Sequence, residues 1–359
     1  MEIKNITYGN FACQEITSQE WDEPYIYIND YLGEDTEVIV PSRINEKPVI
    51  AVMFETANKA VKSIVLSKGI QFINANGFSN FEGLTDISIP GSIETIGESA
   101  FLGCSGLQEI HIPESVHVLS SNTFRGCAKL RCVEGKNISF ISKGAFFGCA
   151  ELKECIVSDN ARISVEYDEF KDTYMYKQAV KNNKALIIGS TLVNGTHIKG
   201  DYTVPADVKW IASKAFLNNY SMTSIKIGAN IDMLFPNTFE RCIVLEYVYM
   251  STAEIKRIPK QCFMNCFKLK KVILPVCCVK IGSSAFYSSG ISSINLERIK
   301  VIEDEAFAHS KMDNENLTLP SLEILGDNCF FSTAVSNVFV DESKVKFLGK
   351  NTDINYIFL

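Results

Sequence analysis

Apolar residues recur along the chain in a fixed pattern, and phenylalanine marks this pattern most clearly. Residues 93–116 contain one complete unit, with an Ala-Phe pair, a Gly-Cys pair, a leucine and an Ile-x-Ile-Pro stretch. Eleven such phenylalanines occur: Phe54, Phe78, Phe101, Phe124, Phe146, Phe216, Phe239, Phe263, Phe286, Phe307 and Phe330. Their spacings are 21 to 24 residues, apart from one gap of 70. Self-similarity at such a period predicts a stack of repeated units.

Each unit combines two local periods. Ile110 and Ile112 flank one polar residue, and this alternation predicts a short strand with one face on a core. Val116, Leu119 and Phe124 are spaced three to five residues apart, which favours a tight turn or a helical turn over a strand. The same strand positions recur at Ile87/Ile89, Ile225/Ile227, Val272/Leu274 and Val338/Val340.

One unit of this size cannot bury its own hydrophobic face, so consecutive units must stack, with their strands paired in parallel at about 4.8 Å per coil. We therefore predict a β-rich α/β solenoid with about 23 residues per repeat. It would be right-handed, with a curved parallel sheet of short strands on one side and helical or 3₁₀ turns on the other. The 46% hydrophobic and 21% charged residues supply enough apolar material for such a core.

The segment Ile89–Leu107 resembles a known repeat. It reads Ile-Pro-x-x-Ile-x-x-Ile-Gly-x-x-Ala-Phe-x-Gly-Cys-x-x-Leu, which is similar to the BspA-type (Treponema pallidum-type) leucine-rich repeat. The resemblance covers most of the chain and implies one leucine-rich-repeat domain over residues 1–359. It also implies an interaction protein associated with a cell surface.

The first residues of the chain differ from the repeats that follow them. Strand-like segments such as Ile26–Gly33 resemble the family's N-terminal cap, which we assign to residues 1–50. A cap is physically required, because the first repeat would otherwise leave an apolar end and an unpaired strand edge in water. Repeats are predicted over 51–157 and again over 205–359, where the last repeat runs into the C-terminal end.

Residues 158–204 interrupt the pattern. We predict an inserted β-hairpin there, with strands at Tyr174–Val180 and Ala185–Ile188 joined by the polar turn Lys181–Lys184. Two degenerate repeats are the alternative, because Phe170 follows Phe146 by 24 residues.

Five of the twelve cysteines lie three residues after an anchor phenylalanine: Cys104, Cys127, Cys149, Cys242 and Cys266. This register predicts a ladder of small buried side chains, since free cysteine behaves as a compact hydrophobe. There is no C-x-x-C pair, and no histidine lies at ligand spacing, so neither a zinc site nor any other metal or cofactor is expected.

Recognisable catalytic motifs are missing from the sequence. None of the four histidines lies in an H-E-x-x-H setting, and G-x-S-x-G, P-loop and G-x-G-x-x-G patterns do not occur. We therefore predict no catalytic residues, and an enzyme with an unrecognised site is a remote alternative. The net charge of −7, without a basic cluster, disfavours nucleic acid as a partner. No run of eighteen apolar residues predicts a transmembrane segment.

Strand side chains that alternate away from the core would form the binding face. Tyrosine is enriched among interface hot spots, which favours the coils that carry Tyr247 and Tyr249. The candidate partner-binding residues are Tyr247, Tyr249, Lys271, Ile273, Lys226, Asn295 and Phe339. The alternative is that these residues only pack against each other across neighbouring strands.

The predicted function is a non-enzymatic scaffold for protein–protein or cell-surface interaction, adhesin-like by resemblance and monomeric. Its ligand would be an unidentified protein or a component of a host matrix. The resemblance implies a protein that is secreted or exposed at the cell surface. An intracellular leucine-rich-repeat scaffold is the alternative, because no apolar signal-peptide segment follows Met1, and the chain would be cytoplasmic if Met1 is the native start.

Overall fold

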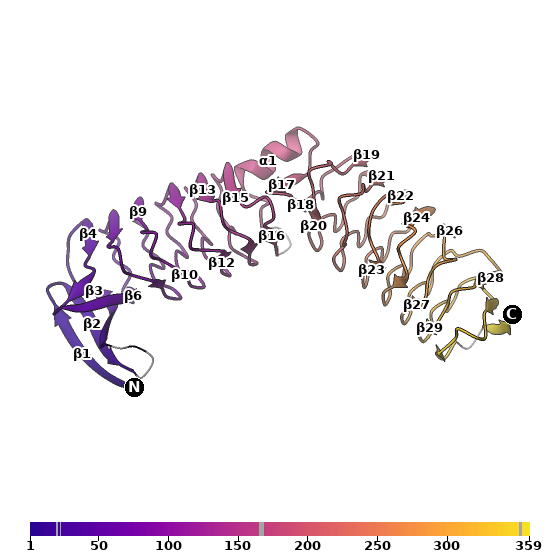
Figure 1. The fold of residues 1–359 in the computed structure, drawn as a ribbon. Helices are drawn as coiled ribbons and strands as arrows, with labels where there is room; N and C mark the ends of the chain where they lie inside the picture. Colours follow the sequence, from indigo (N-terminus) through magenta and orange to yellow (C-terminus); the bar gives the residue numbers. More distant parts are fainter. Residues whose placement is uncertain (19–20, 22, 165–168, 352–353) are drawn as a thin grey trace. The chain divides into compact units, whose positions relative to one another are not determined.

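The computed structural model describes residues 1–18, 21, 23–164, 169–351 and 354–359. The chain divides into two compact units, Met1–Gln178 (unit 1) and Ala179–Leu359 (unit 2). Within each unit the chain winds into coils whose short strands pair in parallel from one coil to the next. Two series of strands result, here called ladder A and ladder B. In Figure 1 they lie on opposite sides of each unit, as β9 and β13 against β10 and β12 show in unit 1.

In unit 1, ladder B begins with the N-terminal strands, which pair antiparallel before the parallel coils start. The strands follow the order β1 (Glu2–Tyr8), β2 (Phe11–Thr17), β3 (Tyr25–Tyr31), β6 (Lys47–Val52), β8 (Phe72–Ile73) and β10 (Thr95–Ile96). The short β5 (Arg43–Ile44) pairs with β6, and a further sheet contains β12 (Val118–Leu119), β14 (Phe140–Ile141) and β16 (Arg162–Ile163). The antiparallel strands therefore cover the first coil on this side.

Ladder A of unit 1 consists of two parallel sheets. They are β4 (Glu37–Val40), β7 (Ser63–Leu66) and β9 (Asp86–Ser88), then β11 (Glu109–His111), β13 (Cys132–Gly135) and β15 (Glu154–Val157). Buried and exposed residues alternate along most of these strands, as in β4, where Val38 and Val40 are buried and Glu37 and Ile39 are exposed. The predicted strand alternation is therefore confirmed.

Unit 2 repeats this arrangement. Ladder A comprises β19 (Gly200–Thr203), β21 (Met222–Lys226), β22 (Tyr247–Tyr249), β24 (Lys271–Ile273) and β26 (Ser293–Ile294), then β28 (Asn316–Leu319), β30 (Asn337–Val340) and β32 (Asn355–Phe358). Ladder B comprises β18 (Thr191–Asn194) and β20 (Trp210–Ile211), then β23 (Arg257–Ile258), β25 (Lys280–Ile281), β27 (Val301–Ile302), β29 (Ile324–Leu325) and β31 (Phe347–Leu348).

The anchor phenylalanines form the centre of each core. All eleven are at most 2% exposed. In unit 1, the rings of Phe101 and Phe124 stack with centroids 5.6 Å apart. In unit 2, Phe239 and Phe263 stack at 5.1 Å with their planes only 1° apart. The near-constant period of the sequence thus places the same side chain at the same position of each coil. The rings form a continuous row within each unit, stacked except at the contact of Phe54 with Phe78, which is edge-to-face.

The predicted helical or 3₁₀ turns are not confirmed. The only helix among the described residues is α1 (Tyr174–Lys181). The turn segments instead contain residues with left-handed backbone conformations, such as Ser99 (φ 56°) and Asn122 (φ 57°), which interrupt a right-handed helix. Leu119, whose spacing suggested a helical turn, belongs to β12 of ladder B. The repeat is therefore β-structure on both sides, joined by tight turns.

Of the two predicted hairpin strands, the first, Tyr174–Val180, is wrong, whereas the second, Ala185–Ile188, coincides with an observed strand, β17 (Leu186–Ile188). Tyr174–Lys181 is helical because Thr173 caps its first turn, where the Thr173 hydroxyl accepts a hydrogen bond of 3.2 Å from the Tyr176 N–H. The hairpin forms later, between β17 and β18. Before the helix, Phe170 lies 5.8 Å from Phe146, so the phenylalanine stack continues for one more step. Residues 165–168 of the predicted insertion lie outside the described residues, and its boundaries stay a prediction.

Candidate functional site

Five of the seven candidate residues lie side by side on ladder A of unit 2. Strand register places Lys226 beside Tyr249, and Tyr249 beside Ile273. The neighbouring row places Tyr247 beside Lys271. These five residues point away from the core, because the residue between them on each strand, such as Val248 in β22, is fully buried. We call this set, Lys226, Tyr247, Tyr249, Lys271 and Ile273, the tyrosine face.

The two tyrosines form the centre of this face. They lie on the same strand, two residues apart, and their rings stack with centroids 6.3 Å apart and planes 11° apart. Tyr249 is 38% exposed, and Tyr247 is half-buried. Packing between the tyrosines therefore occurs along one strand, and it leaves part of the surface of both available to a partner.

Charges around the tyrosines are only partly compensated. Lys270 forms an ion pair of 2.6 Å with Glu246, and its ammonium lies 5.8 Å from the centroid of the Tyr247 ring. The hydrogen bond to Glu246 raises the pKa of Lys270. Lys226 and Lys271 are exposed and form no ion pair within the described part of the chain. The face thus combines aromatic surface with two uncompensated positive charges.

The other two candidates are placed differently. Asn295 follows β26, and its amide accepts a hydrogen bond of 2.8 Å from the Leu274 N–H and donates one of 3.2 Å to the Leu274 carbonyl. The Asn295 side chain is therefore engaged with the backbone of the residue that follows β24. Phe339 is half-buried in β30, which belongs to the separate sheet β28–β30–β32. Neither residue extends the tyrosine face.

The histidines have local structural partners. His111 Nδ1 lies 3.4 Å from Glu134 Oε2 across neighbouring strands, and His197 Nε2 lies 2.7 Å from the Lys184 carbonyl oxygen. Hydrogen bonding to Lys136 lowers the pKa of Glu134, and burial lowers the pKa of His197. Within the described ranges, no cluster of three or more histidine, cysteine, aspartate or glutamate residues could hold a metal ion. No helix in those ranges is long and apolar enough to cross a membrane.

The cysteine ladder has a feature that the sequence did not predict. All five ladder cysteines are fully buried, as predicted, and all five are free thiols. Each thiol also donates a hydrogen bond to the carbonyl of the anchor phenylalanine one coil earlier, as in Cys127 to Phe101 (3.1 Å) and Cys266 to Phe239 (3.0 Å). Burial raises the pKa of Cys104 to about 12, so this thiol stays protonated and able to donate.

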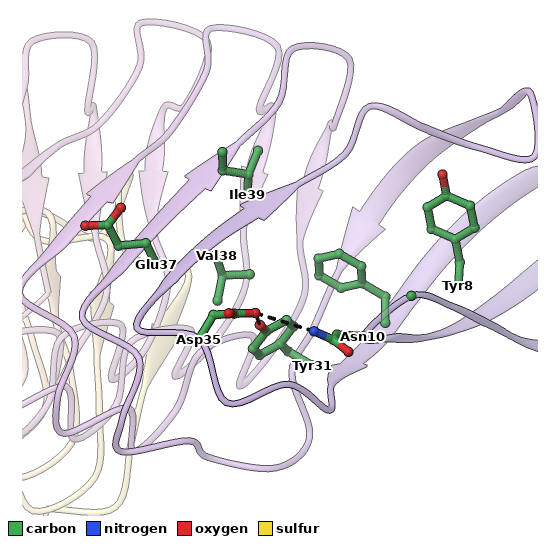
Figure 2. A pocket seen from close by; sticks show the side chains of 9 residues that line it. Tyr8, Asn10, Tyr31, Asp35, Glu37, Val38 and Ile39 are labelled. Atoms are coloured by element: carbon green, nitrogen blue, oxygen red, sulfur yellow. Dashed lines mark hydrogen bonds between the residues drawn. The ribbon is translucent and has the colours of Figure 1, made fainter.

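A second surface feature, also missed from the sequence, lies in unit 1. A pocket of about 180 Å³ is lined by the β1–β2 turn, Tyr8 to Phe11, and by β4 and the residues before it. The Tyr31 hydroxyl and the Asn10 amide both donate hydrogen bonds to Asp35, as Figure 2 shows below Val38 and Ile39. Burial raises the pKa of Tyr31, and the hydrogen bond to Asp35 raises it further. In the sequence, the only indication of this pocket was the group of acidic residues Glu34, Asp35 and Glu37.

Comparisons with known proteins agree with the observed repeat. The family model described as "BspA type Leucine rich repeat region (6 copies)" matches residues 52–177, 163–256, 186–314 and 236–352. No curated protein sequence matches the chain.

Several solved structures are similar to this chain at low sequence identity. The pneumococcal vaccine antigen PcpA is 17% identical, with 98% of this chain and 89% of that chain covered and a TM-score of 0.48. A leucine rich cell surface protein from Faecalibacterium prausnitzii A2-165 is 20% identical (99% and 94% covered, TM-score 0.43). A leucine-rich repeat protein from Bacteroides ovatus ATCC 8483 is 17% identical (99% of both covered, TM-score 0.44).

Proposed function

Because the chain belongs to the BspA-type leucine-rich repeat family, with repeats matched from residue 52 to residue 352, we propose that it is a non-enzymatic scaffold that binds a partner protein. The proposed contact is the tyrosine face on ladder A of unit 2. A row of parallel strands suits this role, since each coil holds its outward side chains at a fixed spacing from those of the next coil.

The main support for this proposal is the pair of partly exposed tyrosines beside two lysines that form no ion pair. Tyr247 and Tyr249 offer rigid aromatic surface with hydroxyl groups, the kind of residue that dominates binding energy in protein interfaces. Lys226 and Lys271 favour a partner whose contact surface carries acidic residues, because opposite charges speed association and disfavour wrong partners.

We also propose that the protein acts at a cell surface or outside the cell, in an adhesin-like role. Support comes from the match to BspA-type repeats, because resemblance to that family implies a surface-associated protein. The experiment is antibody labelling of intact and permeabilised source cells. Labelling of intact cells is expected, whereas labelling only after permeabilisation would favour an intracellular scaffold.

The tyrosine face is tested by capture of proteins from host-matrix and cell extracts. We compare the wild-type chain with a variant that carries Tyr247→Ala, Tyr249→Ala and Ile273→Ala. Loss of hot-spot tyrosines costs about 2 kcal/mol or more each, so the variant is expected to lose a partner that the wild type captures. Equal capture by both proteins would reject this face as the contact.

A matched control removes a similar exposed apolar surface from ladder B. Val301, Ile324 and Phe347 lie in register on β27, β29 and β31, and each points away from the core. The triple alanine variant at these positions is expected to capture the partner as the wild type does. Loss of capture in this control too would indicate a general effect on unit 2 rather than a local contact.

A further inference from the structure

Strand β4 is an edge strand of its sheet, so one of its two hydrogen-bonding sides has no neighbouring strand among the described residues. Within the described residues it pairs only with β7, and the N-terminal strands extend ladder B instead. The carbonyls of Thr36 and Val40 accept hydrogen bonds from the N–H groups of Ser63 (3.1 Å) and Ser67 (3.2 Å), so they face β7. Backbone groups alternate sides along a strand, so the N–H and C=O of Glu37 and Ile39 face the open edge.

The groups at this edge have no protein partner in the described part of the chain. No hydrogen bond is made there by the backbone of Glu37 or Ile39. Such an edge is a template for another strand. The pocket described above runs along it, with Glu37, Val38 and Ile39 on one side and the turn from Tyr8 to Phe11 on the other. Its volume of about 180 Å³ exceeds the roughly 150 Å³ that holds a benzene-sized group, so one side chain fits.

The side chains at this edge define what would fit. Glu34, Asp35 and Glu37 are exposed and form no ion pair within the described residues. Asp35 is held in the pocket wall by two uncharged donors, Tyr31 and Asn10, so its negative charge is not compensated. Ile39 is 68% exposed and Tyr8 is 45% exposed, which adds apolar and aromatic surface beside the carboxylates.

We propose that β4 binds an extended basic peptide segment of a partner protein as an added strand. A lysine or arginine side chain of the peptide enters the pocket, where it pairs with Asp35 and is attracted by the carboxylate of Glu37, while the Tyr8 ring lies at the other end of the pocket. Two residues further along the peptide, an apolar side chain on the same face packs beside Ile39. The backbone of Glu37 and Ile39 supplies the hydrogen bonds, and the alternating side chains supply the specificity.

A second copy of this chain fits the edge less well. A second copy would bring its own acidic segment 34–37 to an edge that already carries three uncompensated carboxylates, and the added negative charge is repelled. A basic peptide removes that repulsion. This site is separate from the tyrosine face, and its test stands whether or not that face binds a partner.

The test is a titration of the full chain into fluorescein-labelled peptides at about 50 mM salt, followed by anisotropy. The probe peptide is Gly-Ser-Lys-Thr-Val-Thr-Ser-Gly, in which the lysine and the valine lie on the same face of a strand, and the comparison peptide has glutamate in place of the lysine. Two further probes carry N-methyl groups, either on the lysine and valine nitrogens or on both threonine nitrogens. We expect the lysine peptide to bind, and one N-methylated probe to lose binding, because only one set of backbone nitrogens faces β4.

Protein variants separate a local effect from a general one. The double variant Asp35→Asn, Glu37→Gln should weaken binding of the lysine peptide about fivefold through two lost ion pairs. The matched control Asp86→Asn, Glu109→Gln removes two exposed carboxylates elsewhere on ladder A and should leave binding unchanged. Ile39→Pro removes an outward N–H at the edge and should abolish binding.

Several results would overturn the proposal. Equal binding of both N-methylated probes would show charge attraction without strand addition. Equal binding of the glutamate peptide, or no binding of the lysine peptide at millimolar protein, would reject the basic occupant. A concentration-dependent dimer that Ile39→Pro dissociates, measured by sedimentation, would assign the edge to a second copy.

Discussion

Removal of one ring from the phenylalanine stack should destabilise unit 2 strongly. Phe263 is fully buried, and its ring stacks on Phe239 at 5.1 Å and on Phe286 at 5.2 Å. Phe→Ala in a core costs about 3–5 kcal/mol, and each aromatic pair adds about 0.5–1.5 kcal/mol beyond area burial. We therefore expect Phe263→Ala to lower the free energy of unfolding of unit 2 by about 4–5 kcal/mol, measured by urea denaturation.

Phe267 provides the matched control, because it is the same residue type four positions later and 54% exposed. Phe267→Ala is expected to change the stability by less than about 1 kcal/mol, as is usual for exposed positions. Each coil of a repeat array contacts mainly its neighbours, so hydrogen exchange should accelerate around β22 to β25 and stay unchanged in unit 1. A loss below about 2 kcal/mol for Phe263→Ala, or equal effects of both variants, would refute the role assigned to the stack.

Three further perturbations test other parts of the structure. Cys266→Ser should keep the hydrogen bond to the Phe239 carbonyl, whereas Cys266→Val should lose it. In urea denaturation the valine variant should therefore be less stable than the serine variant by about 1 kcal/mol. A serine variant less stable than the valine variant would contradict the thiol's role as donor. Hydrogen bonds to Lys346 and Lys300 lower the pKa of Glu323 to about 2, so its stabilising effect is present above the unfolded pKa and is lost as the pH falls toward 2. Glu323→Gln should therefore be less stable than the wild type at pH 6 and approach it near pH 2, and a difference that does not change with pH would contradict the ion pairs. Thr173→Ala should destabilise α1 by about 1 kcal/mol, seen as faster amide exchange over Tyr174–Lys181, and unchanged exchange would contradict the cap.

The sequence predicted the core more reliably than the connections. The period of the phenylalanines predicted stacking because a coil can bury its apolar face only against the same face of the next coil. Ladder B was missed because strands of two residues, such as Val118–Leu119, are too short to show alternation. Helix α1 was mistaken for a strand because the capping role of Thr173 was overlooked, although threonine is a favoured N-cap residue.

The sequence could predict the residues of the candidate site only where strand register determines which side chains face outward and lie next to each other. Tyr247, Tyr249, Lys271, Ile273 and Lys226 follow from alternation and coil position, and they do lie together. For Asn295, alternation could not reveal that its side chain bonds the Leu274 backbone. The pocket of unit 1 was missed because the β1–β2 turn and β4 are about 30 residues apart in the sequence, and no repeat pattern joins them.

The most direct test of the proposed function is hydroxyl-radical footprinting of the chain, alone and in complex with a captured partner. We expect protection of Tyr247, Tyr249 and Ile273, with Phe347 on ladder B modified equally in both samples. Unchanged modification of both tyrosines in the complex, with protection elsewhere, would contradict the assignment of partner binding to this face.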